Sequence, residues 1–186
     1  MNHLKQLEQL VSASVSPYHC ILRSADLLKG AGFTELSLSS SWNLEKGRSY
    51  FVNVFDSTLI GFSIGDELGE APSLRLAASH TDWPCLKVKP SPEVTSGRYG
   101  KLNVEVYGGP LLNTWLDRPL SMAGKVCVMG ENAMEPKTVF VDFKRPLLTI
   151  PNLAIHMNRQ ANEGVAINPQ IDMLPLLTLI TDDLER

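Results

Sequence analysis

The spacing of apolar residues changes along the chain, and this change does most to limit the folds open to it. Residues 3–12 carry leucine and valine at helical spacing. After a short break, Ser16 and Pro17 provide an N-cap followed by proline at the first helical position. The helical pattern that follows is expected to end near Gly30, because glycine commonly occupies the left-handed position that closes a helix. The chain therefore begins with two predicted helices.

From Arg48 onward the apolar period is two, which is typical of strands. Residues 50–55 and 59–64 flank Asp56-Ser57-Thr58, and this arrangement predicts a β-hairpin. Residues 74–79 form a short apolar run of the kind that lies inside a sheet, and they lead directly into His80. Two helices followed by strands, one of them buried, predict an α/β layer.

Beyond about Pro92 the sequence becomes rich in glycine and proline, and these residues separate short β-type runs. This pattern predicts a small β-rich domain over 93–186, following a first domain over 1–92. A further helix is expected over 152–162, and the tail over 173–184 is apolar. The β-type runs cover residues 101–107, 123–129 and 138–143.

Charge and composition exclude several classes of protein. The 186 residues carry a formal net charge of -3, which argues against binding to nucleic acid. No apolar run approaches the ~20 residues needed to cross a bilayer, and the polar, helix-like N-terminus does not resemble a signal peptide. We therefore expect a cytoplasmic protein without a membrane partner. Cys20, Cys85 and Cys127 are odd in number and far apart, so they are expected to be buried free thiols.

The segment from Ala78 to Cys85 carries the clearest chemical signal, a His-x-Asp pair formed by His80 and Asp82 at the end of the predicted buried strand. In open α/β sheets, ligands bind at the carboxyl ends of the strands. A histidine there can offer one ring nitrogen to a metal while a nearby carboxylate fixes the ring. The pair alone also fits a structural or surface histidine, so the spacing leaves both interpretations open.

Several long strings of the sequence resemble the aspartyl aminopeptidase family, whose members are co-catalytic zinc metallo-aminopeptidases. They occur in the order found in that family and cover nearly the whole chain. The strings are 16–19 (SPYH), 31–33 (AGF), 80–82 (HTD), 104–115 (VEVYGGPLLNTW), 142–148 (DFKRPLL) and 150–156 (IPNLAIH).

The resemblance implies part of a catalytic α/β sheet domain over 1–92, followed by the start of an inserted β-rich domain over 93–186 that acts in oligomerisation and as a lid. It also implies that the other ligands of a two-metal site lie beyond Arg186. The chain is then expected to be an N-terminal portion, whether truncated, cleaved or one part of a split protein.

The resemblance also implies roles for individual residues. His80 corresponds to a zinc ligand, and Asp82 to a catalytic carboxylate behind it. His156 corresponds to a histidine that reaches the active site of a neighbouring subunit and hydrogen-bonds the carbonyl under attack. Trp83 stands where the family usually has serine, so we expect a bulkier wall beside the metal.

Three other features are expected to be structural. Asp117 can pair with Arg118 or with a backbone amide. His19 follows the Ser16 cap and is expected to support the start of the helix. Gly108-Gly109-Pro110 lacks the lysine and hydroxyl residue of a phosphate loop, which favours a tight turn.

Two functions of different class follow. The first is a zinc-dependent aminopeptidase that releases N-terminal Asp or Glu from peptides and works as a homo-oligomer, with this chain inactive by itself. The alternative is a non-catalytic remnant that binds or assembles through its β-rich domain.

Overall fold

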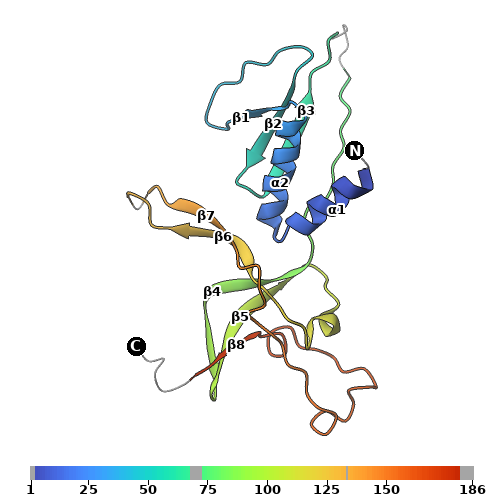
Figure 1. Cartoon of the computed structure of the whole chain (residues 1–186), viewed down its shortest axis with the longest axis vertical. Helices are drawn as coiled ribbons and strands as arrows, with labels where there is room; N and C mark the ends of the chain where they lie inside the picture. The colour runs from blue at the N-terminus through green and yellow to red at the C-terminus, as the bar shows by residue number, and fades with distance from the viewer. Residues whose placement is uncertain (1–2, 68–72, 133, 181–186) are drawn as a thin grey trace. The chain divides into compact units, whose positions relative to one another are not determined.

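A computed structural model describes residues 3–67, 73–132 and 134–180. The chain divides into two compact units, and each consists of two separate segments. The first unit combines Met1–Asp82 with Ala123–Asp142, and the second combines Trp83–Met122 with Phe143–Arg186. The architecture is mixed α/β with small sheets (Figure 1), in agreement with the predicted α/β class.

Both predicted helices are confirmed in the first unit: α1 spans His3–Ala13 and α2 spans Pro17–Gly30. Ser16 caps α2, because its hydroxyl accepts a hydrogen bond from the His19 backbone N–H at 3.3 Å. The Ser16 hydroxyl also lies 2.7 Å from Nδ1 of His19, so His19 supports the helix start as predicted.

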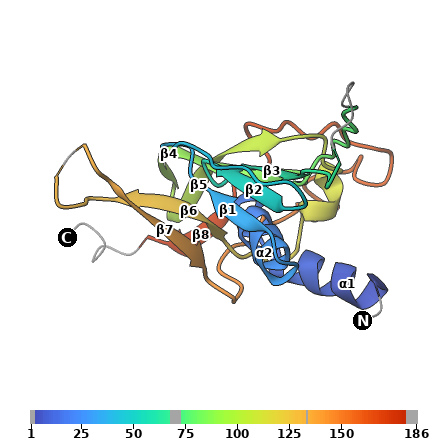
Figure 2. The same ribbon diagram turned by 90° about the horizontal axis from the view of Figure 1, so that it is seen from above.

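The predicted hairpin is also confirmed. Strand β2 (Ser49–Val54) pairs antiparallel with β3 (Thr58–Ser63), and the short β1 (Thr34–Leu36) lies parallel to β2 on its other side. Helix α2 lies against this sheet (Figures 1 and 2). Ile21 of α2 and Phe51 of β2 have no exposed surface, and they anchor the core of this unit.

The first unit also contains the hairpin of β6 (Ala123–Val128) and β7 (Lys137–Asp142), which confirms both predicted strands. Lys125 connects it to the β2–β3 turn, because its ammonium donates to the Phe55 carbonyl at 2.9 Å and lies 3.4 Å from Oδ2 of Asp56. The same ammonium lies 5.0 Å from the centre of the Tyr18 ring. Contacts made by one lysine therefore join parts of the chain about 70 residues apart.

The second unit is built on a three-stranded sheet in the order β4 (Cys85–Ser96), β5 (Tyr99–Tyr107), β8 (Leu176–Leu179). The domain boundary predicted at residue 92 falls inside β4. Pro90 and Pro92 lack the N–H that a ladder needs, and the pairing with β5 shifts register between Val88 and Glu93. The strand therefore continues through the prolines, although its regular pairing with β5 is interrupted there.

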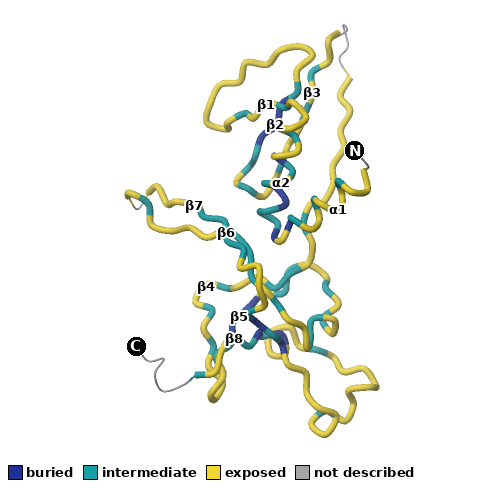
Figure 3. Tube along the Cα trace, viewed as in Figure 1, coloured by how far each residue is buried: buried dark blue, intermediate teal, exposed yellow. Residues whose placement is uncertain are grey.

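Packing in the second unit depends on residues that lie far apart in the sequence. Val104 and Ile150 are each 1% exposed, and Met173 is fully buried. Figure 3 shows buried stretches of the second unit around β5. At Gly100 the strands β5 and β8 approach so closely that a Cβ atom would lie 2.8 Å from Cγ2 of Thr178. A short 3₁₀ helix, η1 (Leu112–Trp115), follows β5. Residues 181–184 of the predicted apolar tail lie outside the described residues.

The prediction of a buried strand over 74–79 is wrong. These residues form no strand, and Leu74 and Leu76 are 88% and 86% exposed. An apolar strand needs backbone partners beside it and side-chain partners on its faces. The described residues pair no strand with this segment, so its pattern has nothing to pack against.

The prediction of a helix over 152–162 is also wrong, because this segment consists of turns and irregular chain. Its hydrogen bonds are isolated, for example from Met157 N to the Ala154 carbonyl at 2.8 Å. The Asn152 side chain accepts from the next backbone amide, that of Leu153, at 2.8 Å. Asparagine side chains that bond nearby backbone compete with helical hydrogen bonds.

The cysteine prediction is correct in part. All three thiols are free, but only Cys20 is buried, whereas Cys85 is half-buried and Cys127 is exposed on β6. Among the described residues, we find no helix with the length and apolar character needed to cross a membrane.

Removing the α2 cap provides a test of this architecture. Ser16→Ala should destabilise the first unit by ~1 kcal/mol, because the His19 N–H loses its acceptor. Urea unfolding followed by circular dichroism at 222 nm measures this change, since both helices belong to the first unit. Ser12→Ala, at an exposed position of α1, is the matched control and should shift the midpoint little. An unchanged midpoint for Ser16→Ala would contradict the cap.

Candidate functional site

His80 and Asp82 lie in an extended segment without regular structure at the end of the first unit's long N-terminal stretch. The His80 side chain is 74% exposed, whereas that of Asp82 is 19% exposed. The imidazole is therefore accessible from solvent and is not enclosed by apolar neighbours.

The structure brings these two side chains together. Nδ1 of His80 lies 2.8 Å from Oδ1 of Asp82 and 3.0 Å from the backbone carbonyl oxygen of the same residue. Both oxygens are acceptors, so Nδ1 carries the proton and donates to them. In the neutral ring, Nε2 then keeps a lone pair.

This arrangement fits one ligand of a zinc site. Zinc-binding histidines usually donate their second ring N–H to a carboxylate or carbonyl, which fixes the tautomer and the direction of the lone pair. His80 and Asp82 match this pattern, because Asp82 engages Nδ1 and leaves Nε2 available for a metal. In the described part of the chain, however, no three His, Cys, Asp or Glu side chains gather closely enough to hold a metal. The described residues thus fit one ligand of such a site, together with the carboxylate that orients it.

His156 lies in the second unit, on an exposed turn. The turn is closed by hydrogen bonds from the amides of Met157 and Asn158 to the Ala154 carbonyl, at 2.8 and 3.1 Å. An exposed imidazole on a turn is open to a partner molecule. The roles of His80, Asp82 and His156 remain predictions, as does the effect of Trp83, whose surface is 38% exposed.

Asp117 pairs with a backbone amide, one of the two partners predicted for it. Its Oδ1 accepts from the Asn152 N–H at 2.9 Å, and its own N–H donates to the Ile150 carbonyl at 2.9 Å. Its φ of +56° is in the left-handed region, which aspartate tolerates better than most residues. No sequence signal identified Asn152 as the partner, because the two residues are 35 positions apart.

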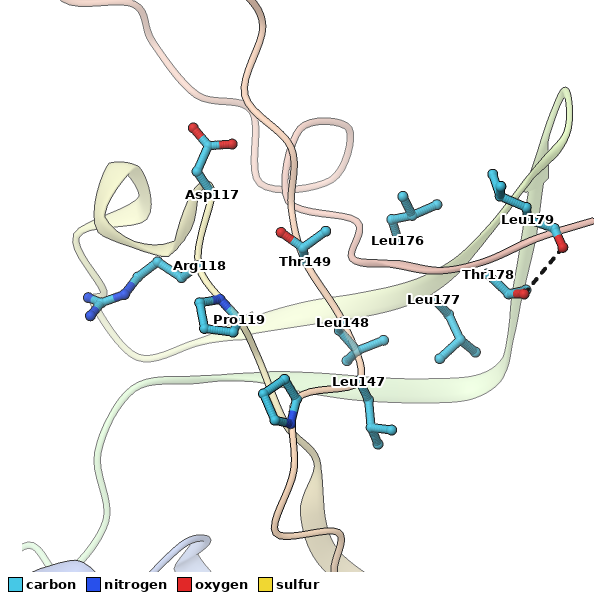
Figure 4. A pocket seen from close by; sticks show the side chains of 11 residues that line it. Asp117, Arg118, Pro119, Leu147, Leu148, Thr149, Leu176, Leu177, Thr178 and Leu179 are labelled. Carbon is cyan, nitrogen blue, oxygen red and sulfur yellow. Dashed lines mark hydrogen bonds between the residues drawn. The ribbon is translucent and has the colours of Figure 1, made fainter.

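An open hollow of about 500 Å³ lies in the second unit (Figure 4). Leucines from two segments line much of it, and the side chains of Asp117 and Arg118 point away from them. His80, Asp82 and His156 are not part of its lining. The hollow is mainly apolar and does not contain the residues predicted to carry chemistry.

Comparison with known proteins identifies the class as zinc-dependent aminopeptidases. The model of the family described as aminopeptidase I zinc metalloprotease (M18) matches residues 10–186. The chain belongs to this family, which confirms the resemblance seen in its motifs.

The curated relatives have the same affiliation. The "Probable M18 family aminopeptidase 2" of Clostridium acetobutylicum is 45% identical over 183 residues, which cover 98% of this chain and 42% of the relative. The protein of that name from Pseudomonas putida is 42% identical over 177 residues, which cover 95% of this chain and 41% of the relative. The chain thus spans about two fifths of the length of these relatives.

Solved structures show the same fold. A chain in the cryo-EM structure of the Ape4 and Nbr1 complex is 37% identical with a TM-score of 0.88, covering 96% of this chain and 34% of that one. Chaetomium thermophilum mApe1 is 28% identical with a TM-score of 0.81, and the match covers 98% of this chain and 41% of that one. The S. cerevisiae mApe1 dodecamer, at 24% identity and a TM-score of 0.71 over 96% and 39%, supports the fold alone.

The His80–Asp82 geometry predicts a tautomer that can be measured. In long-range ¹H–¹⁵N spectra of the neutral ring, His80 should carry its proton on Nδ1, because Asp82 accepts there. Asp82→Ala should shift the population toward the Nε2–H form, while exposed His3 should be unchanged as an internal reference. An Nε2–H ring in the unmodified chain would show that Asp82 does not orient it.

Proposed function

We propose that this chain is part of a zinc-dependent aminopeptidase that releases N-terminal Asp or Glu from peptides in the cytoplasm. The observation that carries the proposal is the His80 ring, whose Nδ1 is engaged by Asp82 while the side chain is 74% exposed. Membership of the M18 family supports the zinc and the reaction class. The activity is proposed for a protein of the relatives' length, of which this chain supplies about two fifths.

His80 would hold one zinc ion of a two-metal site through Nε2. Asp82 keeps the ring in the required tautomer and, as an anion, favours a positively charged centre beside the imidazole. When bound, zinc supplies Lewis acidity to the peptide carbonyl and to the attacking water. The remaining ligands and the general base would come from outside these 186 residues.

His156 would act on the substrate from an adjacent subunit. A ring N–H can donate a hydrogen bond to the carbonyl oxygen as negative charge develops on it. The exposure of His156 on a turn of the second unit supports this role, since the side chain must reach another molecule. The role requires a homo-oligomer, with the predicted lid domain over 93–186 as the assembling part.

The alternative is a non-catalytic remnant that binds or assembles through its β-rich part. One observation favours it for the chain alone: in the described stretches, no three potential metal ligands come together. Zinc binding and hydrolysis separate the two functions.

For the isolated chain we expect weak zinc binding and no hydrolysis. Isothermal titration calorimetry should detect one weak site that His80→Ala removes and that Asp82→Ala weakens about tenfold or more. His3→Ala, another exposed histidine of the first unit, should leave the affinity unchanged. Turnover of Asp-p-nitroanilide by the isolated chain would contradict the proposal that the remaining metal ligands lie outside it. Zinc binding that survives His80→Ala would contradict the role of His80 as the zinc ligand of this chain.

Activity can be tested in a chimera in which this chain replaces the matching 183 residues of the Clostridium acetobutylicum relative. We expect release from Asp- and Glu-p-nitroanilide in preference to Leu-p-nitroanilide. His80→Ala should abolish it, and His156→Ala should lower kcat about 10²-fold, as the loss of a donor to the oxyanion does. A folded, zinc-loaded chimera that prefers the leucine substrate would refute the acidic specificity.

A further inference from the structure

We propose that Asp117 is a positioning residue for His156, because its carboxylate anchors the start of the exposed segment that carries this histidine. The inference rests on the role proposed above for His156. It concerns a residue that does not touch the substrate and acts through the backbone.

The segment that carries His156 has little packing to hold it. Between Pro151 and Asp172 every residue is exposed except Asn158 and Ile167, which are half-buried. A segment with few buried apolar contacts opens easily and takes its position from the hydrogen bonds at its ends. The direction of the His156 ring therefore depends on how residues 151–153 leave the core.

Asp117 fixes the start of this exposed segment with two hydrogen bonds. Its N–H donates to the carbonyl of Ile150, which is 1% exposed, and its Oδ1 accepts from the Asn152 N–H, both at 2.9 Å. The two bonds lie on either side of Pro151, which has no N–H of its own to offer. In the part of the chain that the structure describes, the Asn152–Asp117 bond is the last one before His156 that reaches another segment.

Short local bonds connect this anchor to His156. The Asn152 side chain accepts from Leu153 N at 2.8 Å, and the next residue, Ala154, accepts from Met157 and Asn158 to close the turn around His156. Three residues thus separate Asn152, whose amide is anchored, from His156, and the local hydrogen bonds span most of that stretch. A shift of the anchor would be passed to the ring, and a misplacement of about 1 Å can cost on the order of 10²-fold in rate.

The left-handed backbone of Asp117, at φ +56°, allows a matched pair of variants. Asp117→Asn keeps an acceptor oxygen and tolerates this backbone, whereas Asp117→Gly suits the backbone but removes the acceptor. A difference between the two variants therefore isolates the hydrogen bond from the backbone conformation.

The first measurement is amide hydrogen exchange in the 186-residue chain. Asp117→Gly should speed exchange at Asn152 on the order of tenfold, and Asp117→Asn should stay close to the unmodified chain. Equal exchange in both variants would overturn the anchor, whatever the activity of the protein.

The second measurement uses the chimera with the Clostridium acetobutylicum relative. Asp117→Gly should lower kcat about tenfold or more with KM and zinc content unchanged, and Asp117→Asn should restore it. In the His156→Ala background, Asp117→Gly should have no further effect on kcat, because the two residues act through one contact. An additive loss in the double variant would overturn positioning through His156.

The two proposals fail in distinguishable ways. Unchanged kcat in His156→Ala alone would remove the catalytic role proposed for that histidine and the catalytic meaning of Asp117. The exchange measurement would still decide whether Asp117 anchors the segment.

Discussion

Backbone pairing between distant segments fixes the register of the chain in the second unit. In the second unit the run from Leu147 to Asn152 lies between two other segments: Leu120 bonds to Leu148 on one side, and Leu176 to Thr149 on the other. Because every buried backbone N–H and C=O needs a partner, this run must keep its register. Both the apolar hollow and the exposed segment that carries His156 take their positions from it.

The candidate metal ligand His80 is held by a local contact instead of by pairing between distant segments. Its partner, Asp82, is only two positions away in the sequence. A local contact of this kind forms wherever the backbone allows it, so it survives although the predicted strand before it is not formed. It fixes which nitrogen of His80 is available. It does not bring further ligands, because these must come from elsewhere in the sequence or from outside it.

Much of the fold was predictable because its signals are local. The Ser16 cap and the hairpin around Asp56 depend on residues a few positions apart, and both formed as predicted. The failures were of two kinds. The apolar run over 74–79 indicates a strand only if other strands flank it. At 152–162, the helix prediction neglected side chains such as Asn152 that bond nearby backbone.

The sequence by itself determined the family, the boundaries of α1 and α2, and the spacing that lets Asp82 reach His80. Motifs, caps and short-range contacts depend on residues that are close together in the sequence. Only the tertiary structure decided that Lys125 joins the β6–β7 hairpin to the β2–β3 turn, and that Asp117 accepts from Asn152. Contacts between residues 35 and 70 positions apart depend on how the chain closes its loops, and no local pattern specifies which ends will meet.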